Sequence, residues 1–239
     1  MKIDFSDQVV LVAGGTGGLG KAVSLGFIEA GANVIVTYHS EVEFRALKEL
    51  VGPDQSSLEG HQVDVTDESA SADLVNRVLK QHGAVDALVN TVGGYAGGVK
   101  LWDLETIVFD RMLELNLRSG YMLARAVMPI MLKAGHGSIV NVSAKAAFDH
   151  GAGAAAYAAS KAGALALMDS IAADAKGTGV RVNSILPSVI DTPANRRAMP
   201  DADFATWPKP VDIAHVILFL SSDFAKSIHG AAIPVYGYS

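Results

Sequence analysis

Several features that would indicate other classes of protein are missing from this sequence. It has no cysteine, which excludes disulfides and thiolate metal sites and fits a reducing compartment. No uncharged apolar run approaches the roughly 18 residues that a membrane helix requires. Acidic residues occur near the N-terminus, where a signal peptide would be apolar. We therefore expect a soluble, cytoplasmic protein without a membrane partner.

Basic residues are too few and too scattered to form a nucleic-acid-binding surface. The chain has 19 Lys and Arg against 25 Asp and Glu, a formal net charge of -6. Its 7 histidines are dispersed, so we predict no metal site. Only 18% of the 239 residues are charged and 50% are hydrophobic, which provides for a large core. We expect one domain, 1–239, with no nucleic-acid partner.

Short apolar segments alternate with amphipathic segments along the chain. Several apolar segments are continuous, as in parallel strands that are buried on both faces of a sheet. The predicted strands are 9–13, 33–38, 57–63, 87–90, 138–142, 181–186 and 231–235. The predicted helices are 18–30, 41–51, 68–82, 104–133, 154–177 and 211–222. This order predicts an α/β single-domain Rossmann fold, with a doubly wound, mostly parallel seven-stranded sheet and helices on both faces.

The segment 187–210 interrupts this alternation. It is rich in proline and shows little periodicity. Long irregular segments in a compact domain are usually lids or binding loops. We therefore expect 187–210 to form a lid loop over the substrate.

The loop after the first predicted strand is rich in glycine and leads into a helix. Glycines allow a tight turn and a close approach of pyrophosphate, and the amides at a helix N-terminus attract negative charge. A flexible turn without a ligand would not need this placement between strand and helix. The candidate phosphate-binding residues are Gly14, Thr16, Gly17, Gly18 and Leu19.

Tyr157 and Lys161 lie four residues apart in the predicted helix 154–177, so both side chains share one helix face. A carbonyl that accepts a hydride also needs a proton, and a phenol with a pKa of about 10 is a poor donor at neutral pH. An ammonium about 4 Å away favours the phenolate by roughly 4 kcal/mol at an effective dielectric of about 20. We predict Tyr157 as the general acid or base, with a pKa that Lys161 lowers towards neutrality.

Two further polar residues complete the predicted catalytic group. Ser143 follows the predicted strand 138–142, at the edge where a parallel sheet binds its ligand. Its hydroxyl can polarise and position a substrate oxygen. Asn116 interrupts the predicted helix 104–133, where an asparagine is otherwise usually a solvated or satisfied polar residue. Together these residues predict chemistry on a carbonyl or alcohol.

The glycine loop and the four catalytic candidates, in this order and spacing, resemble the classical short-chain dehydrogenase/reductase family over essentially the whole chain. The resemblance implies that Asn116 holds a water that links Lys161 to solvent. It also implies that Asp64 bonds the adenine amino group and that Thr192 contacts the nicotinamide carboxamide. Asn90 corresponds to a structural asparagine of the family. The cofactor-binding residues that follow the strands are then Asp64, Val65, Asn90, Gly93, Pro187, Val189 and Thr192.

The end of the predicted strand 33–38 bears on the choice of cofactor. A carboxylate there usually bonds the ribose hydroxyls of NAD and repels the 2′-phosphate of NADP. This strand ends instead in Tyr38, His39 and Ser40. The next acids, Glu41 and Glu43, belong to a capping box that Ser40 opens. The missing acid favours NADP as the cofactor, with NAD as the alternative.

Three segments, 92–98, 144–149 and 191–207, resemble those of quinoid dihydropteridine reductase, which lacks the serine and asparagine kept here. All three are expected at the mouth of the ligand crevice. Tyr95 can stack on a flat heterocycle or serve only as a turn residue, and Trp207 can instead attach the lid to the body. The candidate substrate-contacting residues are Tyr95, Lys145, His150, Met199 and Trp207.

These patterns predict an NAD(P)(H)-dependent oxidoreductase that moves a hydride between the nicotinamide and a small-molecule carbonyl or alcohol. Reduction of a quinoid pterin is the alternative substrate class. A regulator that senses nicotinamide without turnover is the alternative from another class. Many alanines in the predicted helix 154–177 allow close helix contact, so we expect a homodimer or homotetramer.

Overall fold

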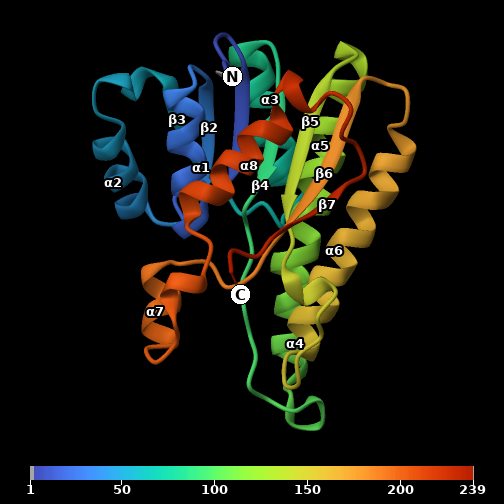
Figure 1. Cartoon of the computed structure of the whole chain (residues 1–239). Helices are drawn as coiled ribbons and strands as arrows, with labels where there is room; N and C mark the ends of the chain where they lie inside the picture. Colours follow the sequence, from blue (N-terminus) through green and yellow to red (C-terminus); the bar gives the residue numbers. More distant parts are fainter. Residues whose placement is uncertain (1–2, 239) are drawn as a thin grey trace.

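The architecture is a seven-stranded sheet in the order β3-β2-β1-β4-β5-β6-β7, flanked by helices, in a computed structural model that describes residues 3–238 (Figure 1). Every neighbouring pair of strands is parallel, β7 included. The strands are β1 Val9–Ala13, β2 Asn33–Tyr38, β3 Leu58–Gln62, β4 Ala87–Asn90, β5 Gly137–Val142, β6 Val180–Pro187 and β7 Ala232–Val235. The predicted doubly wound Rossmann fold is confirmed, with a sheet that is parallel across its whole width.

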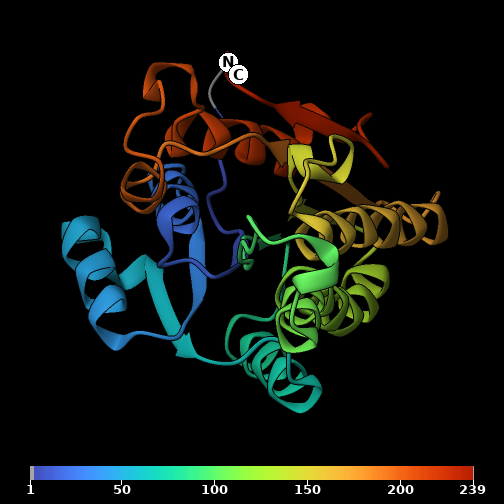
Figure 2. The same cartoon turned by 90° about the horizontal axis from the view of Figure 1, so that it is seen from below.

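The helices cover both faces of this sheet (Figure 2). They are α1 Gly18–Glu29, α2 Glu41–Val51, α3 Glu68–His82, α4 Thr106–Leu113, α5 Ser119–Ala134, α6 Ala155–Asp174, α7 Pro193–Ala198 and α8 Pro210–Ser221. Helices α1, α2 and α8 share one apolar core with the sheet, in which Phe27 and Ile217 are fully buried. Helices α3, α5 and α6 share the other, in which Leu74 and Leu123 are fully buried. Burial of each such side chain contributes about 1.5–3 kcal/mol, which fixes the helices on the sheet.

The strand order reverses direction between β1 and β4, and the helices α1 and α5, which follow these two strands, lie on opposite faces of the sheet. In an open parallel sheet the ligand crevice lies outside the carboxyl ends of the strands at this point. Helices α4 and α7 both extend beyond that edge, at the lower end of Figure 1. The fold therefore gathers the loops after β1, β4, β5 and β6 around one opening.

Two predicted segments have more structure than the sequence indicated. The predicted helix 104–133 is divided into α4, a π-helical turn Glu114–Arg118 and α5. The predicted lid 187–210 contains α7 and a short 3-10 turn, Phe204–Thr206. Both features are local changes in hydrogen bonding, which hydrophobic periodicity does not detect.

Between residues 3 and 238, none of the helices combines the length and the apolar character needed to span a bilayer.

Candidate active site

The glycine loop makes a turn that side chains could not enter. Gly14 has φ +73°, and a Cβ added to Gly20 would lie 2.1 Å from Gly14 O. Gly17 is the N-cap of α1 and has no side chain to occupy its first turn. The backbone amides of α1 therefore remain open to an anion, which is the donor set that a pyrophosphate requires.

The loop borders a cavity of about 200 Å³ at the carboxyl ends of β1, β2 and β4. Threonines fix its walls: Thr37 Oγ1 accepts from Gly14 N at 3.0 Å, and Thr91 Oγ1 donates to Ala13 O at 2.7 Å. The cavity is lined by Gly14, Thr16, Gly17, Thr37, Tyr38, His39, Glu43, Val63, Val65, Thr91, Val92, Gly93 and Leu115. Of the residues predicted to bind the cofactor, the structure brings Gly14, Thr16, Gly17, Tyr38, His39, Val65 and Gly93 to this cavity. That they bind a dinucleotide stays a prediction.

The polar residues after β2 and β3 have local partners. Tyr38 donates its hydroxyl to Glu41 at 2.7 Å and stacks on Phe44. Ser40 caps α2 by accepting from Glu43 N, as predicted. Asp64 accepts from both the hydroxyl and the amide of Thr66, and these bonds lower the pKa of Asp64. The carboxylate of Asp64 is thus engaged within its own turn, so a contact with adenine stays a prediction.

Asn116 occupies the π-helical turn between α4 and α5, where it is buried. Its amide donates to Ser160 Oγ at 2.9 Å and to Gly94 O at 3.0 Å, and its oxygen accepts from Gly94 N at 2.9 Å. It is therefore a satisfied residue that ties the loop after β4 to α6. A π-turn widens the helix at one residue, a common device at functional sites.

Lys161 and Ser143 are buried together at the end of β5. Lys161 Nζ donates to Val142 O at 2.9 Å, and Ser143 Oγ donates to Lys161 O at 2.9 Å. A Cβ on Gly93 would lie 3.2 Å from Lys161 Nζ and 2.7 Å from Asn116 Oδ1. Glycine at position 93 therefore lets the β4 loop approach the buried ammonium.

The two titratable groups on α6 are shifted by burial. Burial lowers the pKa of Lys161 to about 8, so the ammonium is still mostly protonated at neutral pH. Burial, followed by the nearby Tyr95, raises the pKa of Tyr157 to about 12. The prediction that Lys161 lowers the pKa of Tyr157 is therefore wrong for this state. The reason is that the ammonium is directed at the Val142 carbonyl while the phenol loses its hydration.

The candidate substrate residues lie in different environments. Tyr95 is 70% exposed and its ring meets the Tyr157 ring edge-on, with centroids 4.9 Å apart. Lys145, just after β5, lies over the Tyr236 ring, 5.2 Å from its centroid. His150 bonds Ala147 O at 3.2 Å. Tyr95 is the one that the structure places directly against a predicted catalytic group.

The lid residues divide in the same way. Met199 is exposed, whereas Trp207 is buried and packs on Phe204. This packing fits the alternative role of Trp207, attaching the lid to the body, and a substrate contact of Trp207 stays a prediction. A Cβ on Gly18 would lie 3.0 Å from the Thr192 methyl, so the lid begins against the phosphate loop.

Among the remaining residues predicted to bind the cofactor, Thr192 and Asn90 form hydrogen bonds within the protein. Thr192 Oγ1 accepts from Asn195 N and caps α7, so its hydroxyl is used locally. Asn90 donates to Asn141 Oδ1 at 2.9 Å and accepts from Val92 N, which links β4 to β5. Pro187 ends β6 and Val189 follows it at the surface. Leu19 is buried in the α1 core.

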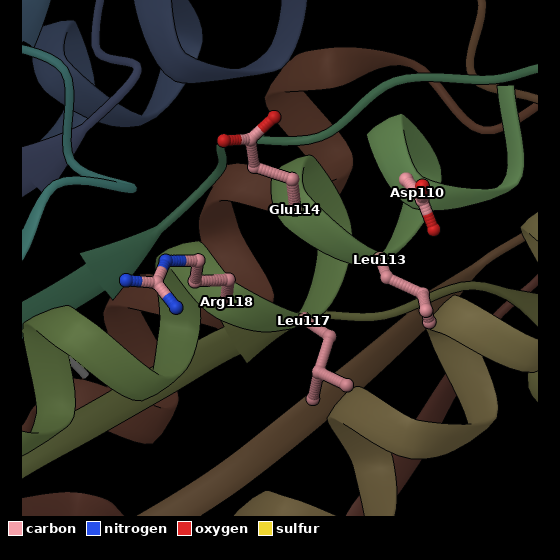
Figure 3. A pocket seen from close by; sticks show the side chains of 5 residues that line it. All are labelled: Asp110, Leu113, Glu114, Leu117 and Arg118. Atoms are coloured by element: carbon pink, nitrogen blue, oxygen red, sulfur yellow. The ribbon is translucent and has the colours of Figure 1, made fainter. Parts of the chain in front are cut away.

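A second hollow, of about 470 Å³, lies on the surface of α4 and the π-helical turn Glu114–Arg118 (Figure 3). It is lined by Asp110, Leu113, Glu114, Leu117 and Arg118. It is larger than the cavity at the glycine loop but contains none of the predicted site residues. Arg118, moreover, donates to Thr66 O at 2.8 Å and so holds the π-helical turn against the loop after β3. The chemistry is therefore placed at the smaller cavity.

Three residues of the site were missed by reasoning from the sequence. Ser160 links Asn116 to the Tyr157 carbonyl, to which it donates at 2.8 Å. Thr91 fastens the loop after β4 to the glycine loop. Glu43 accepts from Thr16 Oγ1 at 3.2 Å. Only Ser160 carried a usable signal, its place beside Lys161 on the catalytic helix.

A parallel doubly wound sheet with an uncapped glycine loop at its crevice defines a dinucleotide-binding protein of the Rossmann type. A model of the short chain dehydrogenase family matches residues 8–203. The chain therefore belongs to the short-chain dehydrogenase family, which confirms the predicted resemblance. It is an NAD(P)-dependent oxidoreductase that transfers a hydride.

Individual relatives are similar along almost the whole chain. The 3-oxoacyl-(acyl-carrier-protein) reductase FabG of Thermotoga maritima is 31% identical over 238 residues, which cover 96% of each chain. The L-rhamnose 1-dehydrogenase (NAD(P)(+)) of Sphingomonas sp. strain SKA58 is 32% identical, covering 96% of this chain and 95% of the relative. A short-chain type dehydrogenase/reductase from Mycobacterium ulcerans is 27% identical, with a TM-score of 0.92 over 98% of this chain and 90% of the other.

Proposed function

We propose that this protein interconverts a carbonyl compound and an alcohol, with Tyr157 as the general acid or base. The single observation that supports this assignment is the convergence of Asn116, Ser143, Tyr157 and Lys161 beside the glycine loop. Their contacts join the π-helical turn Glu114–Arg118, the end of β5 and α6. A nicotinamide dinucleotide, when bound, supplies or accepts the hydride.

In the reductive direction the chain's own residues handle the proton. The Tyr157 phenol, held protonated by burial, donates its proton to the oxygen that becomes the alcohol. The phenolate left behind would be costly in a buried site without a cation, and the Lys161 ammonium on the same helix face supplies one. Its present acceptor, Val142 O, keeps the ammonium in place beside the site until then.

Ser143 and Asn116 position the centre. The Ser143 hydroxyl, which now donates to Lys161 O, can turn to donate to the substrate oxygen and polarise it. Asn116 holds Gly94 and Ser160 and so sets the distance between the β4 loop and α6. A water bridge from Lys161 to solvent through Asn116 remains part of this proposal.

The cofactor is bound along the glycine loop and the cavity beside it. Gly14, Gly17 and Gly18 would hold the pyrophosphate through the α1 amides. Tyr38, His39 and Ser40 offer no carboxylate at the end of β2, which favours NADP(H). NAD(H) is the alternative, for which Glu43 would supply a carboxylate from the neighbouring helix α2.

The substrate is proposed to enter between Tyr95, Lys145 and the lid 187–210. Oxidation of NADH and NADPH by the purified protein, with a panel of ketones, 3-oxoacyl thioesters and quinoid dihydropterin, tests the assignment. Turnover of a carbonyl that Tyr157→Phe abolishes supports it. Turnover of the pterin alone contradicts it and would assign the exposed Tyr95 ring to a flat heterocycle. An unaltered biological output with Tyr157→Phe would favour a nicotinamide sensor.

We further propose that the protein assembles as a homodimer or homotetramer through α6. Ala155, Ala159 and Ala166 are exposed on one face of this helix, where small side chains allow a second helix to approach closely. Light scattering at micromolar concentration tests the proposal, and a monomeric mass contradicts it.

A further inference from the structure

Glu43 lies in the first turn of α2, where its carboxylate reaches across to the glycine loop. In a reciprocal capping box the glutamate three residues after the cap would turn back to the N-cap amide. Here Ser40 accepts from Glu43 N, but Glu43 Oε2 accepts from Thr16 Oγ1 at 3.2 Å. Thr16 is itself buried in the loop. The carboxylate is therefore attached to the phosphate-binding loop rather than to its own helix end.

This contact places a negative charge in the cavity beside the loop. Glu43 lines that cavity together with Thr37, Tyr38 and His39 of the β2 end. Among the described residues that line it, none is a lysine or an arginine. The other acid of the same helical turn, Glu41, is turned towards Tyr38 and Arg45. Glu43 is thus the carboxylate of α2 that faces this cavity.

The end of β2 is where a Rossmann fold separates the ribose hydroxyls of NAD from the 2′-phosphate of NADP. A phosphate monoester carries about -1.5 to -2 charges at pH 7 and is normally matched by arginine or lysine. Among the described residues that line this cavity, such a phosphate would meet the Glu43 carboxylate and His39, but neither a lysine nor an arginine. Ribose hydroxyls, in contrast, can donate to that carboxylate.

We propose that Glu43, held by Thr16, selects NAD(H) over NADP(H) in place of the missing acid at the end of β2. The proposal rests on the proposed function, because it presupposes that a nicotinamide dinucleotide occupies this cavity. It reverses the preference for NADP(H) that the sequence of the strand end predicts. The acid comes from the next helix, five residues beyond the end of the strand, and reaches the cavity through the tertiary fold.

The test is a fluorescence titration that gives the dissociation constants of NADH and NADPH separately, without turnover. Wild type is expected to bind NADH at least about 10-fold more tightly than NADPH, a difference of about 1.4 kcal/mol. Glu43→Gln should reduce the ratio of the NADPH dissociation constant to the NADH dissociation constant about 10-fold, chiefly because the variant binds NADPH more tightly than wild type does. Glu41→Gln, an acid of the same turn that faces Arg45, should leave the ratio unchanged. High salt should lower this ratio of dissociation constants for wild type, because salt screens the repulsion between the partly solvated Glu43 carboxylate and the 2′-phosphate of NADPH.

Competition by adenosine 2′,5′-bisphosphate and 5′-AMP in the wild-type protein gives a second measurement that needs no variant. Weaker competition by the bisphosphate supports the proposal. Tighter binding of NADPH than NADH by wild type, or an equal change in both glutamine variants, overturns it. If neither dinucleotide binds, the proposed function itself fails, and this inference fails with it.

Discussion

Replacing Lys161 by methionine removes a buried charge and keeps an unbranched apolar side chain of similar length. Lys161 is 5% exposed, and its ammonium donates to Val142 O at 2.9 Å. Methionine adapts to irregular spaces, so the cavity left behind is small. The variant therefore separates the effect of the Lys161 charge on the free energy of unfolding from its effect on turnover.

The destabilisation caused by the buried charge follows from the pKa of Lys161, which burial lowers from 10.5 to about 8. This difference corresponds to about 3 kcal/mol at about 1.4 kcal/mol for each unit of pKa. Because the folded pKa lies below the unfolded one, the unfolded chain binds more protons between pH 8 and 10.5, and wild-type stability rises with pH there. Below pH 8 both states are protonated, and the whole cost is present. Loss of the bond to Val142 O offsets about 1 kcal/mol of the gain.

Denaturant unfolding of both proteins, from pH 7 to pH 10.5, measures this effect. At pH 7 we expect Lys161→Met to be more stable by about 2 kcal/mol, a rise in Tm of roughly 4–8 °C. The difference in the free energy of unfolding between Lys161→Met and wild type should fall by about 3 kcal/mol as the pH rises from 7 to 10.5. Turnover should be lost in the same variant, because Tyr157 then lacks its cation.

The matched control is Lys133→Met on α5, an exposed lysine whose replacement should change stability by less than about 0.5 kcal/mol at every pH. If Lys161→Met is less stable than wild type at pH 7, the buried ammonium does not destabilise the folded protein. If its advantage does not depend on pH, the lowered pKa is wrong. Either result refutes the reasoning.

Three further outcomes are expected at the same site. Tyr157→Phe should reduce turnover at least about 100-fold while dinucleotide binding and Tm stay unchanged; Tyr121→Phe on α5 is the control, and equal losses would reject the assignment. Phenolate absorbance should show no contribution from Tyr157 until the pH is well above 10, because burial raises its pKa to about 12, and a contribution near pH 7 would contradict this value. Gly20→Ala should abolish dinucleotide binding, since its Cβ would lie 2.1 Å from Gly14 O, whereas Gly26→Ala, with 3.4 Å to a leucine side chain, should retain it.

Local patterns determined the class of fold. Continuous apolar runs mark strands that are buried on both faces, and an intervening amphipathic helix requires the next strand to be parallel. The glycine loop follows because only glycine permits the contact between Gly20 and Gly14 O. The family and hydride transfer could also be predicted, because the glycine loop and the catalytic residues occur in a characteristic order and spacing along the chain. The roles of individual residues stay predictions.

The tertiary structure decided matters that depend on what each side chain meets. The pKa of Tyr157 rises instead of falling, because desolvation depends on neighbours such as Tyr95 from a distant loop. Trp207 is buried against Phe204, although its position in the sequence equally allowed a ligand contact. Lys145, from the loop after β5, lies over the Tyr236 ring beyond β7.

Glu43 shows the division most clearly. The sequence alone determined that Ser40 caps a helix whose third residue is a glutamate, because capping involves neighbouring amides. It could not determine where that carboxylate points, since the choice between the helix end and Thr16 depends on how α2 packs beside the glycine loop. Hydrophobic periodicity and the spacing of motif residues are local properties that can be read directly from the sequence. The direction of a flexible charged side chain, and the charge of the cavity it enters, are set by contacts between segments far apart along the chain.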